Sequence, residues 1–131
     1  MRPLPVGDRQ LVQIVDAALA DATRRGGDWL ACRPGCTQCC VGVFAISAID
    51  ALRLQHGLLE LERNDPARAK PICERARKSS ARLADGFPGD STTGILHKDP
   101  DSLARFEDFA NDEPCPALDP TTGLCDLYSS R

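Results

Sequence analysis

The chain has few aromatic residues and no long apolar run. Phe, Trp and Tyr make up 5% of its 131 residues, so the hydrophobic core is expected to be thin. No apolar stretch approaches the roughly 18 residues of a membrane-spanning helix, and we expect no membrane partner. The 16 Lys and Arg residues are outnumbered by 19 Asp and Glu residues. This balance lacks the basic excess of nucleic-acid-binding proteins, so no nucleic-acid partner is expected.

The first residues also lack the apolar stretch of roughly 7–15 residues that a secretory signal contains. This absence predicts a cytoplasmic protein. The chain nevertheless has seven cysteines. Because cytosolic thiols are kept reduced, clustered cysteines in such a chain indicate metal or redox chemistry rather than structural disulfides. The odd number of cysteines also disfavours a closed disulfide framework.

Apolar periodicity and capping signals predict a mainly α-helical single domain that spans residues 1–131. We expect helices over residues 8–25, from Ser47 to near Asn64, and from Pro66 to near Leu83. A short fourth helix is expected to carry Leu103, Phe106 and Phe109. Residues 41–46 could form a short buried strand, residues 86–100 look irregular, and the proline-rich tail after Asn111 is expected to be loop. The cysteines therefore fall in connections between helices.

The spacing of the cysteines predicts a metal site. Cys36 and Cys39 have the spacing of a structural zinc knuckle. Together with Cys32 they form a more widely spaced motif of three cysteines, which also suits an iron–sulfur cluster. A turn over residues 119–123 would fold Cys125 back toward Cys115. Thiolates are soft ligands for zinc and iron. The candidate metal ligands are Cys32, Cys36, Cys39, Cys40, Cys115 and Cys125.

Several alternatives remain open at this point. Because side chains of adjacent residues usually diverge, Cys39 and Cys40 could serve different ions, or one could be a non-ligand. Six thiols allow one four-ligand site with spare thiols or a larger shared cluster. Cys73 stands alone on the apolar face of an expected helix and suits a small buried hydrophobe. His56 and His97 lie outside ligand spacing of any cysteine. The acidic pair at 112–113 and the basic residues at 75, 77 and 78 are expected to be solvated.

The sequence resembles the YkgJ-type cysteine-cluster family, whose members are described as zinc- or iron-chelating proteins. The resemblance is carried by three motifs in about 30 residues. They are the run Cys32, Cys36, Cys39, Cys40; then Cys115-Pro116-Ala117-Leu118; and then Gly123-Leu124-Cys125-Asp126-Leu127-Tyr128. The family pattern continues with Arg-Pro and a last Cys, whereas this sequence ends at Arg131. Either the sequence is cut short or its site lacks one thiolate.

These observations favour a protein that chelates zinc or iron, the iron either as an ion or in an iron–sulfur cluster, through cysteine thiolates. Two other functions remain open. One is a small iron–sulfur oxidoreductase that transfers electrons, and the other is a zinc-stabilised module that binds a protein partner. The sequence shows no Ser/His/Asp or Cys/His catalytic arrangement and no phosphate-binding glycine loop. It therefore identifies no catalytic residue.

Overall fold

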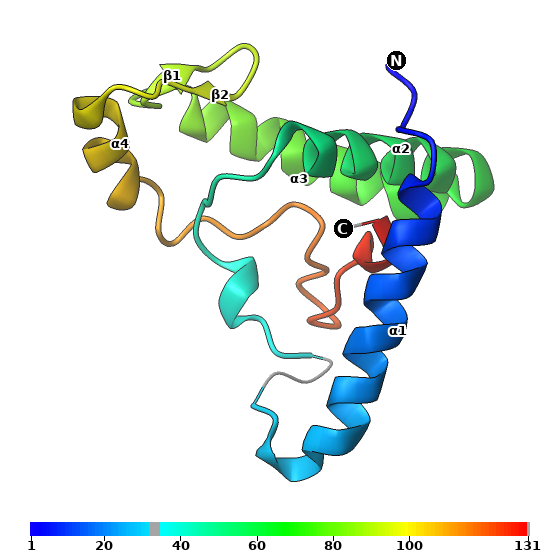
Figure 1. Ribbon diagram of the computed structural model, residues 1–131. Helices are drawn as coiled ribbons and strands as arrows, with labels where there is room; N and C mark the ends of the chain where they lie inside the picture. Colours follow the sequence, from blue (N-terminus) through cyan, green and yellow to red (C-terminus); the bar gives the residue numbers. More distant parts are fainter. Residues whose placement is uncertain (32–34, 131) are drawn as a thin grey trace.

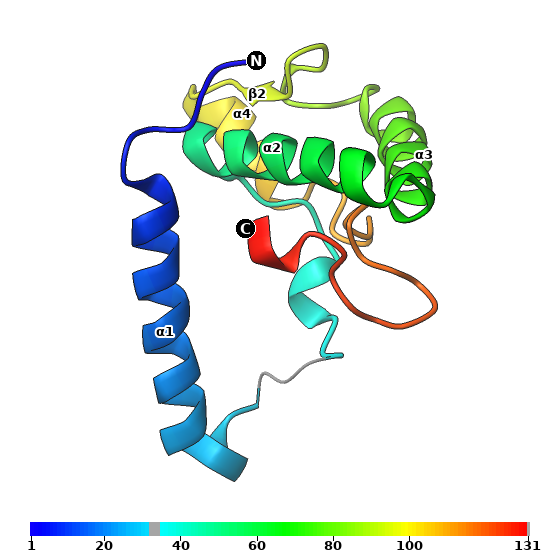
Figure 2. The same ribbon diagram turned by 90° about the vertical axis from the view of Figure 1, so that its right-hand side faces the viewer.

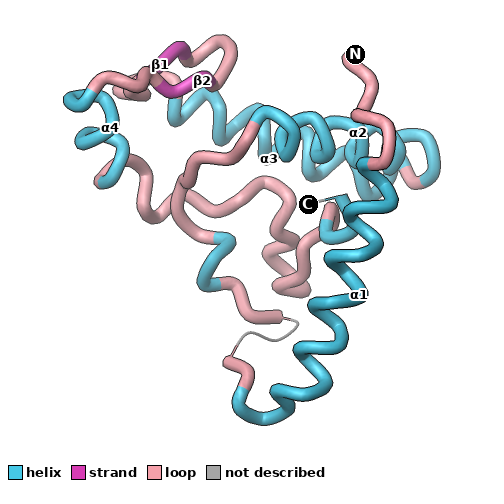
Figure 3. Tube along the Cα trace, in the orientation of Figure 1, coloured by secondary structure: helices cyan, strands magenta, loops and turns pink. Residues whose placement is uncertain are grey.

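The computed structural model describes residues 1–31 and 35–130, so Cys32 lies outside the described residues. The fold is mainly helical, as predicted (Figure 1). Short 3-10 turns and a two-stranded antiparallel sheet accompany the helices, and both cysteine-bearing segments are mainly loop (Figure 3). The elements are α1 (Asp8–Gly26), η1 (Gly27–Trp29), η2 (Gln38–Cys40), α2 (Ala48–Asn64), α3 (Pro66–Leu83), β1 (Gly89–Asp90), β2 (Ile95–Leu96), α4 (Pro100–Glu107) and η3 (Tyr128–Ser130).

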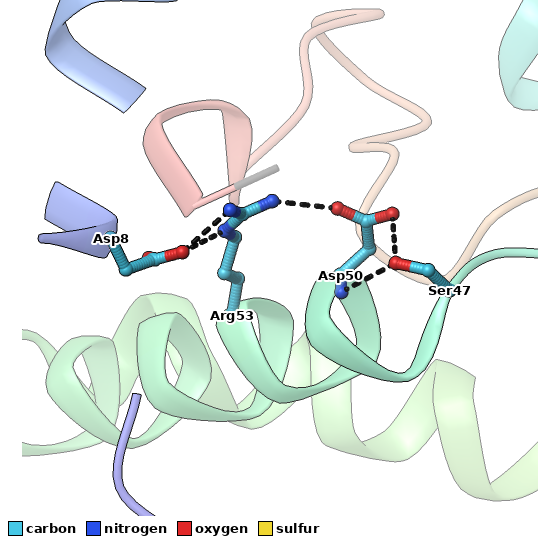
Figure 4. Close-up of polar contacts among 4 residues, drawn as sticks. All are labelled: Asp8, Ser47, Asp50 and Arg53. Atoms are coloured by element: carbon cyan, nitrogen blue, oxygen red, sulfur yellow. Dashed lines mark hydrogen bonds and ion pairs between the residues drawn. The ribbon is translucent and has the colours of Figure 1, made fainter. Parts of the chain in front are cut away.

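The starts of α2 and α3 follow from side-chain caps. Ser47 precedes α2, and its hydroxyl oxygen accepts a hydrogen bond from the backbone N–H of Asp50 at 3.2 Å (Figure 4). The same hydroxyl is the main cause that lowers the pKa of the Asp50 carboxyl. Asp65 caps α3 in the same way by accepting from the N–H of Arg68 at 3.2 Å. Such caps satisfy N–H groups that the first helical turn leaves unpaired, which explains why both predicted starts are confirmed.

The apolar core lies where α2 and α3 pack side by side and the C-terminal loop covers them (Figure 2). Ile72 on α3 is 2% exposed, and it packs with Ala117 and Leu127 from the loop. Partly buried Leu54, Leu58, Leu61 and Cys125 complete this cluster. The core is small, as expected from the composition. It therefore fixes the loop that bears Cys115 and Cys125 directly onto the helix pair.

Three predicted segments differ from the structure. Helix α4 ends at Glu107, so Phe109 lies in the turn that follows it and not on the helix. Residues 41–46 do not form a buried strand, because only Val41 makes a bridge, with Pro114, and the side chains of Phe44 and Ile46 are exposed. Residues 86–100 are more regular than predicted. They contain the hairpin of β1 and β2, which is closed by the Gly94 N–H donating to the Asp90 carbonyl at 2.8 Å.

Helix α1 projects from the rest of the molecule (Figures 1 and 2). Its first residue, Asp8, forms an ion pair with Arg53 of α2, whose Nε donates to the carboxylate at 2.9 Å (Figure 4). The side chains of Asp8 and Arg53 are 7% and 17% exposed. This pair joins the start of α1 to α2. Within residues 1–31 and 35–130, no helix has both the length and the apolar character needed to cross a membrane.

From the position of the core, we expect Ile72 to contribute more to stability than the exposed Ile95. Ile72→Ala is expected to lower the free energy of unfolding by about 2–5 kcal/mol, because it leaves a cavity under the C-terminal loop. Urea denaturation followed by circular dichroism measures this loss. Ile95→Ala is the matched control, because its side chain is 64% exposed. Equal losses in the two variants would contradict this assignment of the core.

Candidate metal centre

Two distant segments meet through their backbones beside the cysteines. The N–H of Cys115 donates to the carbonyl of Cys40 at 2.7 Å, and the N–H of Gly42 donates to the carbonyl of Glu113 at 2.8 Å. Val41 and Pro114 form an antiparallel bridge between these two bonds. The segment that follows η2 and the segment that follows α4 therefore lie side by side (Figure 1). This pairing brings Cys40 next to Cys115.

A tight turn returns the chain from Cys115 to Cys125. The Asp119 carboxylate accepts from the N–H of Thr121 at 2.8 Å, and this bond is the main cause that lowers the pKa of Asp119. The N–H of Gly123 donates to the Asp119 carbonyl at 2.8 Å. Leu118 and Cys125 then form an antiparallel bridge. The turn predicted over residues 119–123 is thus confirmed, and it folds the chain back at Cys125.

The thiol of Cys40 interacts with three other thiols. Partial burial is the main cause that raises its pKa, and a hydrogen bond and charge repulsion from Cys39 add to the effect. The thiols of Cys115 and Cys125 raise the pKa of Cys40 further through charge. Electrostatic effects of this kind require proximity. The structure therefore places three other predicted ligands, Cys39, Cys115 and Cys125, within electrostatic range of Cys40.

The adjacent cysteines differ from the expectation that their side chains diverge. Cys39 and Cys40 lie in the short 3-10 turn η2, which is closed by the N–H of Cys40 donating to the carbonyl of Thr37 at 2.9 Å. Their side chains interact directly. The two thiols therefore lie within interaction distance of each other.

Cys36 lies three residues before Cys39 in the sequence, and its side chain is exposed. Its neighbours Gly35 and Thr37 both approach Gly123, where an added Cβ would lie 3.6 Å from the Gly35 carbonyl oxygen and 3.6 Å from the Thr37 methyl carbon. The segment that contains Cys36 therefore rests against the turn between Cys115 and Cys125.

The thiols are gathered but not arranged as a formed coordination shell. All six cysteines in the described part of the chain are free. Across residues 1–31 and 35–130, no three or more His, Cys, Asp or Glu side chains are grouped closely enough to hold a metal ion. Cys36, Cys39 and Cys115 are exposed, so a metal can reach them from solvent. Binding would require the side chains to rotate toward a common centre.

The lone cysteine and His56, which were not predicted to be ligands, have different surroundings. The Cys73 thiol donates to the Glu62 carboxylate at 3.3 Å, and its pKa is raised mainly by burial and then by this contact. The Nε2 of His56 lies 2.9 Å from the carbonyl oxygen of Arg2, near the start of the chain. Neither interaction involves the thiols around Cys40.

Sequence reasoning missed three arginines that hold the cysteine loop. Arg75 was expected to be solvated, yet its Nε donates to the Pro116 carbonyl at 2.9 Å and its side chain is 29% exposed. The arginines at 68 and 75 both form ion pairs with Asp126, at 3.2 and 3.6 Å. Arg82 forms an ion pair with Glu113, which was also expected to be solvated.

The spacing of these three arginines was the sequence feature that could have indicated their contacts with the loop. Positions 68, 75 and 82 are each two helical turns apart, so they lie on one face of α3. That spacing indicates a basic helix face. It does not identify the carboxylates that the face binds, because those lie in the loop some 30–60 positions later in the chain.

Comparisons with protein-family models, curated proteins and solved structures found no match to this chain.

The backbone pairing depends on Gly42. Its φ is +99°, and an added Cβ would lie 3.1 Å from the carbonyl oxygen of Asn111. Gly42→Ala is expected to cost more than the roughly 1–2 kcal/mol of left-handed strain alone, as measured by urea denaturation. Gly94→Ala is the control, because Gly94 has φ +72° but nothing within 4 Å of its added Cβ. A smaller loss for Gly42→Ala than for Gly94→Ala would show that the approach of the Asn111 carbonyl does not require glycine at position 42.

The Arg82–Glu113 pair predicts a pH dependence. The hydrogen bond from Arg82 is the main cause that lowers the pKa of Glu113 from its ordinary 4.5. The pair therefore stabilises the fold above pH 4.5, and the contribution is lost as pH falls through the lower folded pKa. Thermal unfolding of Glu113→Gln should differ most from wild type at neutral pH and converge with it in acid. Asp112→Asn is the control. A difference that stays constant across pH would argue against the pair.

Proposed function

We propose that this chain is a metal-binding protein that holds zinc or iron, the iron either as an ion or in an iron–sulfur cluster, through clustered cysteine thiolates. The observation that supports this most directly is the position of the Cys40 thiol, which interacts with the thiols of Cys39, Cys115 and Cys125. These residues come from two segments that lie far apart in the sequence. Core packing accounts for the position of Cys125, which completes the apolar cluster, but not for Cys39 and Cys115, which are exposed.

The donor set fits either metal. Zinc in structural sites takes four ligands, and a four-iron cluster is also held by four cysteines. Cys39, Cys40, Cys115 and Cys125 supply four sulfur donors, and Cys36 is a fifth candidate on the segment beside them. Cys32 remains a candidate that lies outside the described residues. The resemblance to the YkgJ-type family implies the same chemistry and stays a prediction.

Positive charges lie next to the proposed ligands. A hollow of about 130 Å³ brings Cys115 together with Arg75, Lys78 and Arg82 of α3. A metal bound by four thiolates carries net negative charge. The nearby cations offset that charge by Coulomb attraction. The basic face of α3 therefore suits a thiolate centre electrostatically as well as holding the loop in place.

A bound metal would supply a cross-link between the two segments and would favour the deprotonated form of its ligands. The protein's own residues do the rest. The pairing of residues 40–42 with 113–115 sets the two segments side by side, and the Asp119 turn returns Cys125 to them. Because the apolar core is small, metal-binding energy is expected to contribute to folding energy.

Metal content tests the proposal. Cys40→Ser, purified anaerobically, is expected to lose most of its bound zinc or iron and part of its thermal stability, because the Cys40 thiol interacts with the thiols of Cys39, Cys115 and Cys125. Elemental analysis measures the metal, and an absorption spectrum separates colourless zinc from a coloured iron–sulfur cluster.

Cys73→Ser is the matched control. Serine keeps a donor for the Glu62 carboxylate, so this variant should retain the wild-type metal content. Equal loading of the two variants would exclude Cys40 as a ligand. A wild-type protein without zinc or iron would refute the proposed function.

A further inference from the structure

Cys40 and Cys115 lie directly opposite each other across the backbone pairing beside the candidate metal centre. Val41 and Pro114 form an antiparallel bridge, so the residue before Val41 is opposite the residue after Pro114. The N–H of Cys115 donates to the carbonyl of Cys40 at 2.7 Å, which fixes this register. In an antiparallel pair, opposite side chains lie on the same face of the two segments, and their Cα atoms are about 4.5–5.5 Å apart.

This placement suits a disulfide bond between the two residues. Disulfides in proteins join cysteines whose Cα atoms are roughly 4.4–6.8 Å apart. Both thiols are free, and they interact with each other through charge. The Cys115 side chain is exposed, whereas that of Cys40 is partly buried. An oxidant in solution can therefore reach Cys115 while Cys40 is held opposite it.

The neighbouring thiols are less well placed for such a bond. Cys39 and Cys40 are adjacent, and Cα atoms across a trans peptide are only about 3.8 Å apart, which is below the disulfide range. Cys39 also lies one position before the paired residues, outside the register that sets Cys40 opposite Cys115. Cys125 is bridged to Leu118 and packs on the apolar core, so its backbone partner is not a cysteine.

We propose that Cys40 and Cys115 are a redox-active pair, which hydrogen peroxide oxidises to an intramolecular disulfide. The Cys115 sulfur attacks one peroxide oxygen, so that an S–O bond forms, the O–O bond breaks, and hydroxide leaves with the thiol proton as water. The Cys40 sulfur then attacks the Cys115 sulfur. An S–S bond forms, the S–O bond breaks, and the hydroxyl group leaves with the Cys40 thiol proton as a second water. The two thiols lose two electrons, and the peroxide gains them.

The surroundings of Cys115 suit its role as the sulfur that is attacked first by the oxidant. Reactive cysteines typically lie at exposed, electropositive positions. Cys115 is exposed, and it lines a hollow of about 130 Å³ together with Arg75, Lys78 and Arg82. Both arginines are ion-paired with carboxylates of the C-terminal loop. Within residues 1–31 and 35–130, Lys78 makes no ion pair, so its charge remains uncompensated beside this hollow.

Disulfide formation and metal binding exclude each other at these residues, a consequence that rests on the proposed function. The disulfide removes two of the four sulfur donors, so oxidation is expected to release bound zinc or iron. The disulfide also joins the same two segments that a metal would cross-link. It closes a long loop of the chain and restricts the unfolded state. The oxidised, metal-free protein is therefore expected to keep the pairing of residues 40–42 with residues 113–115.

Peptide mapping of the full chain tests this inference. Wild-type protein is purified anaerobically, treated with an equimolar amount of hydrogen peroxide, and then alkylated so that the remaining thiols cannot exchange. Digestion with trypsin places Cys40 in the peptide 26–53 and Cys115 in the peptide 106–131. Mass spectrometry without reductant is expected to show these two peptides joined as the main oxidised product, with fragment ions that assign the bond to Cys40 and Cys115.

Matched serine variants identify the bonded residues. Cys40→Ser and Cys115→Ser are each expected to lose the joined peptides, whereas Cys39→Ser and Cys125→Ser should still form them. Each variant replaces one sulfur atom by oxygen, so the four variants differ only in the position of the change. Circular dichroism checks that each variant keeps the helix content of the wild type.

Two results would overturn the inference. One is wild-type protein in which peroxide leaves the two peptides separate or joins them through other cysteines. The other is a yield of joined peptides in Cys40→Ser that equals the wild-type yield. Metal content, measured before oxidation, is a separate readout of the proposed function. Protein that holds no zinc or iron but forms the bond between Cys40 and Cys115 would refute the metal-binding proposal and support this inference.

Discussion

The candidate site depends on one short piece of backbone pairing, between residues 40–42 and residues 113–115. Two hydrogen bonds, of 2.7 and 2.8 Å, hold it together. Gly42 makes the close approach possible, because its positive φ and missing side chain leave room for the carbonyl oxygen of Asn111. Without this pairing, Cys39 and Cys40 would have no reason to lie near Cys115, and the Asp119 turn would bring Cys125 back only toward Cys115.

The protein holds this arrangement in place with few apolar residues. Ile72, Ala117 and Leu127 form a small core that fixes the loop at two points. Arginines on one face of α3 bind the same loop through the Pro116 carbonyl, Asp126 and Glu113. Each partly exposed ion pair contributes little by itself, so their main effect is to fix the position of the loop. Such a frame, with a thin core and gathered thiols, is the kind of fold to which a metal cross-link adds most.

Local signals in the sequence predicted a large part of this structure. The caps at Ser47 and Asp65 fix the starts of α2 and α3, and the turn at Asp119 follows from its own residues. The sequence did not predict features that depend on distant partners. Residues 41–46 look like a strand by composition, yet only Val41 finds a partner. The partners of Arg75 and Arg82 also lie far along the chain, so their spacing indicated a basic face without indicating its role. For the candidate site, cysteine spacing identified the residues, whereas the side-by-side placement of Cys40 and Cys115 required the fold.

The most direct test of the thiolate centre is X-ray absorption spectroscopy at the metal edge of anaerobically purified, full-length protein. The account predicts a first shell made mainly of sulfur, at about 2.3 Å for zinc. Iron-loaded protein should likewise show sulfur as its main first-shell neighbour. A first shell made of nitrogen and oxygen alone would contradict it, because the metal would then be bound away from the cysteines.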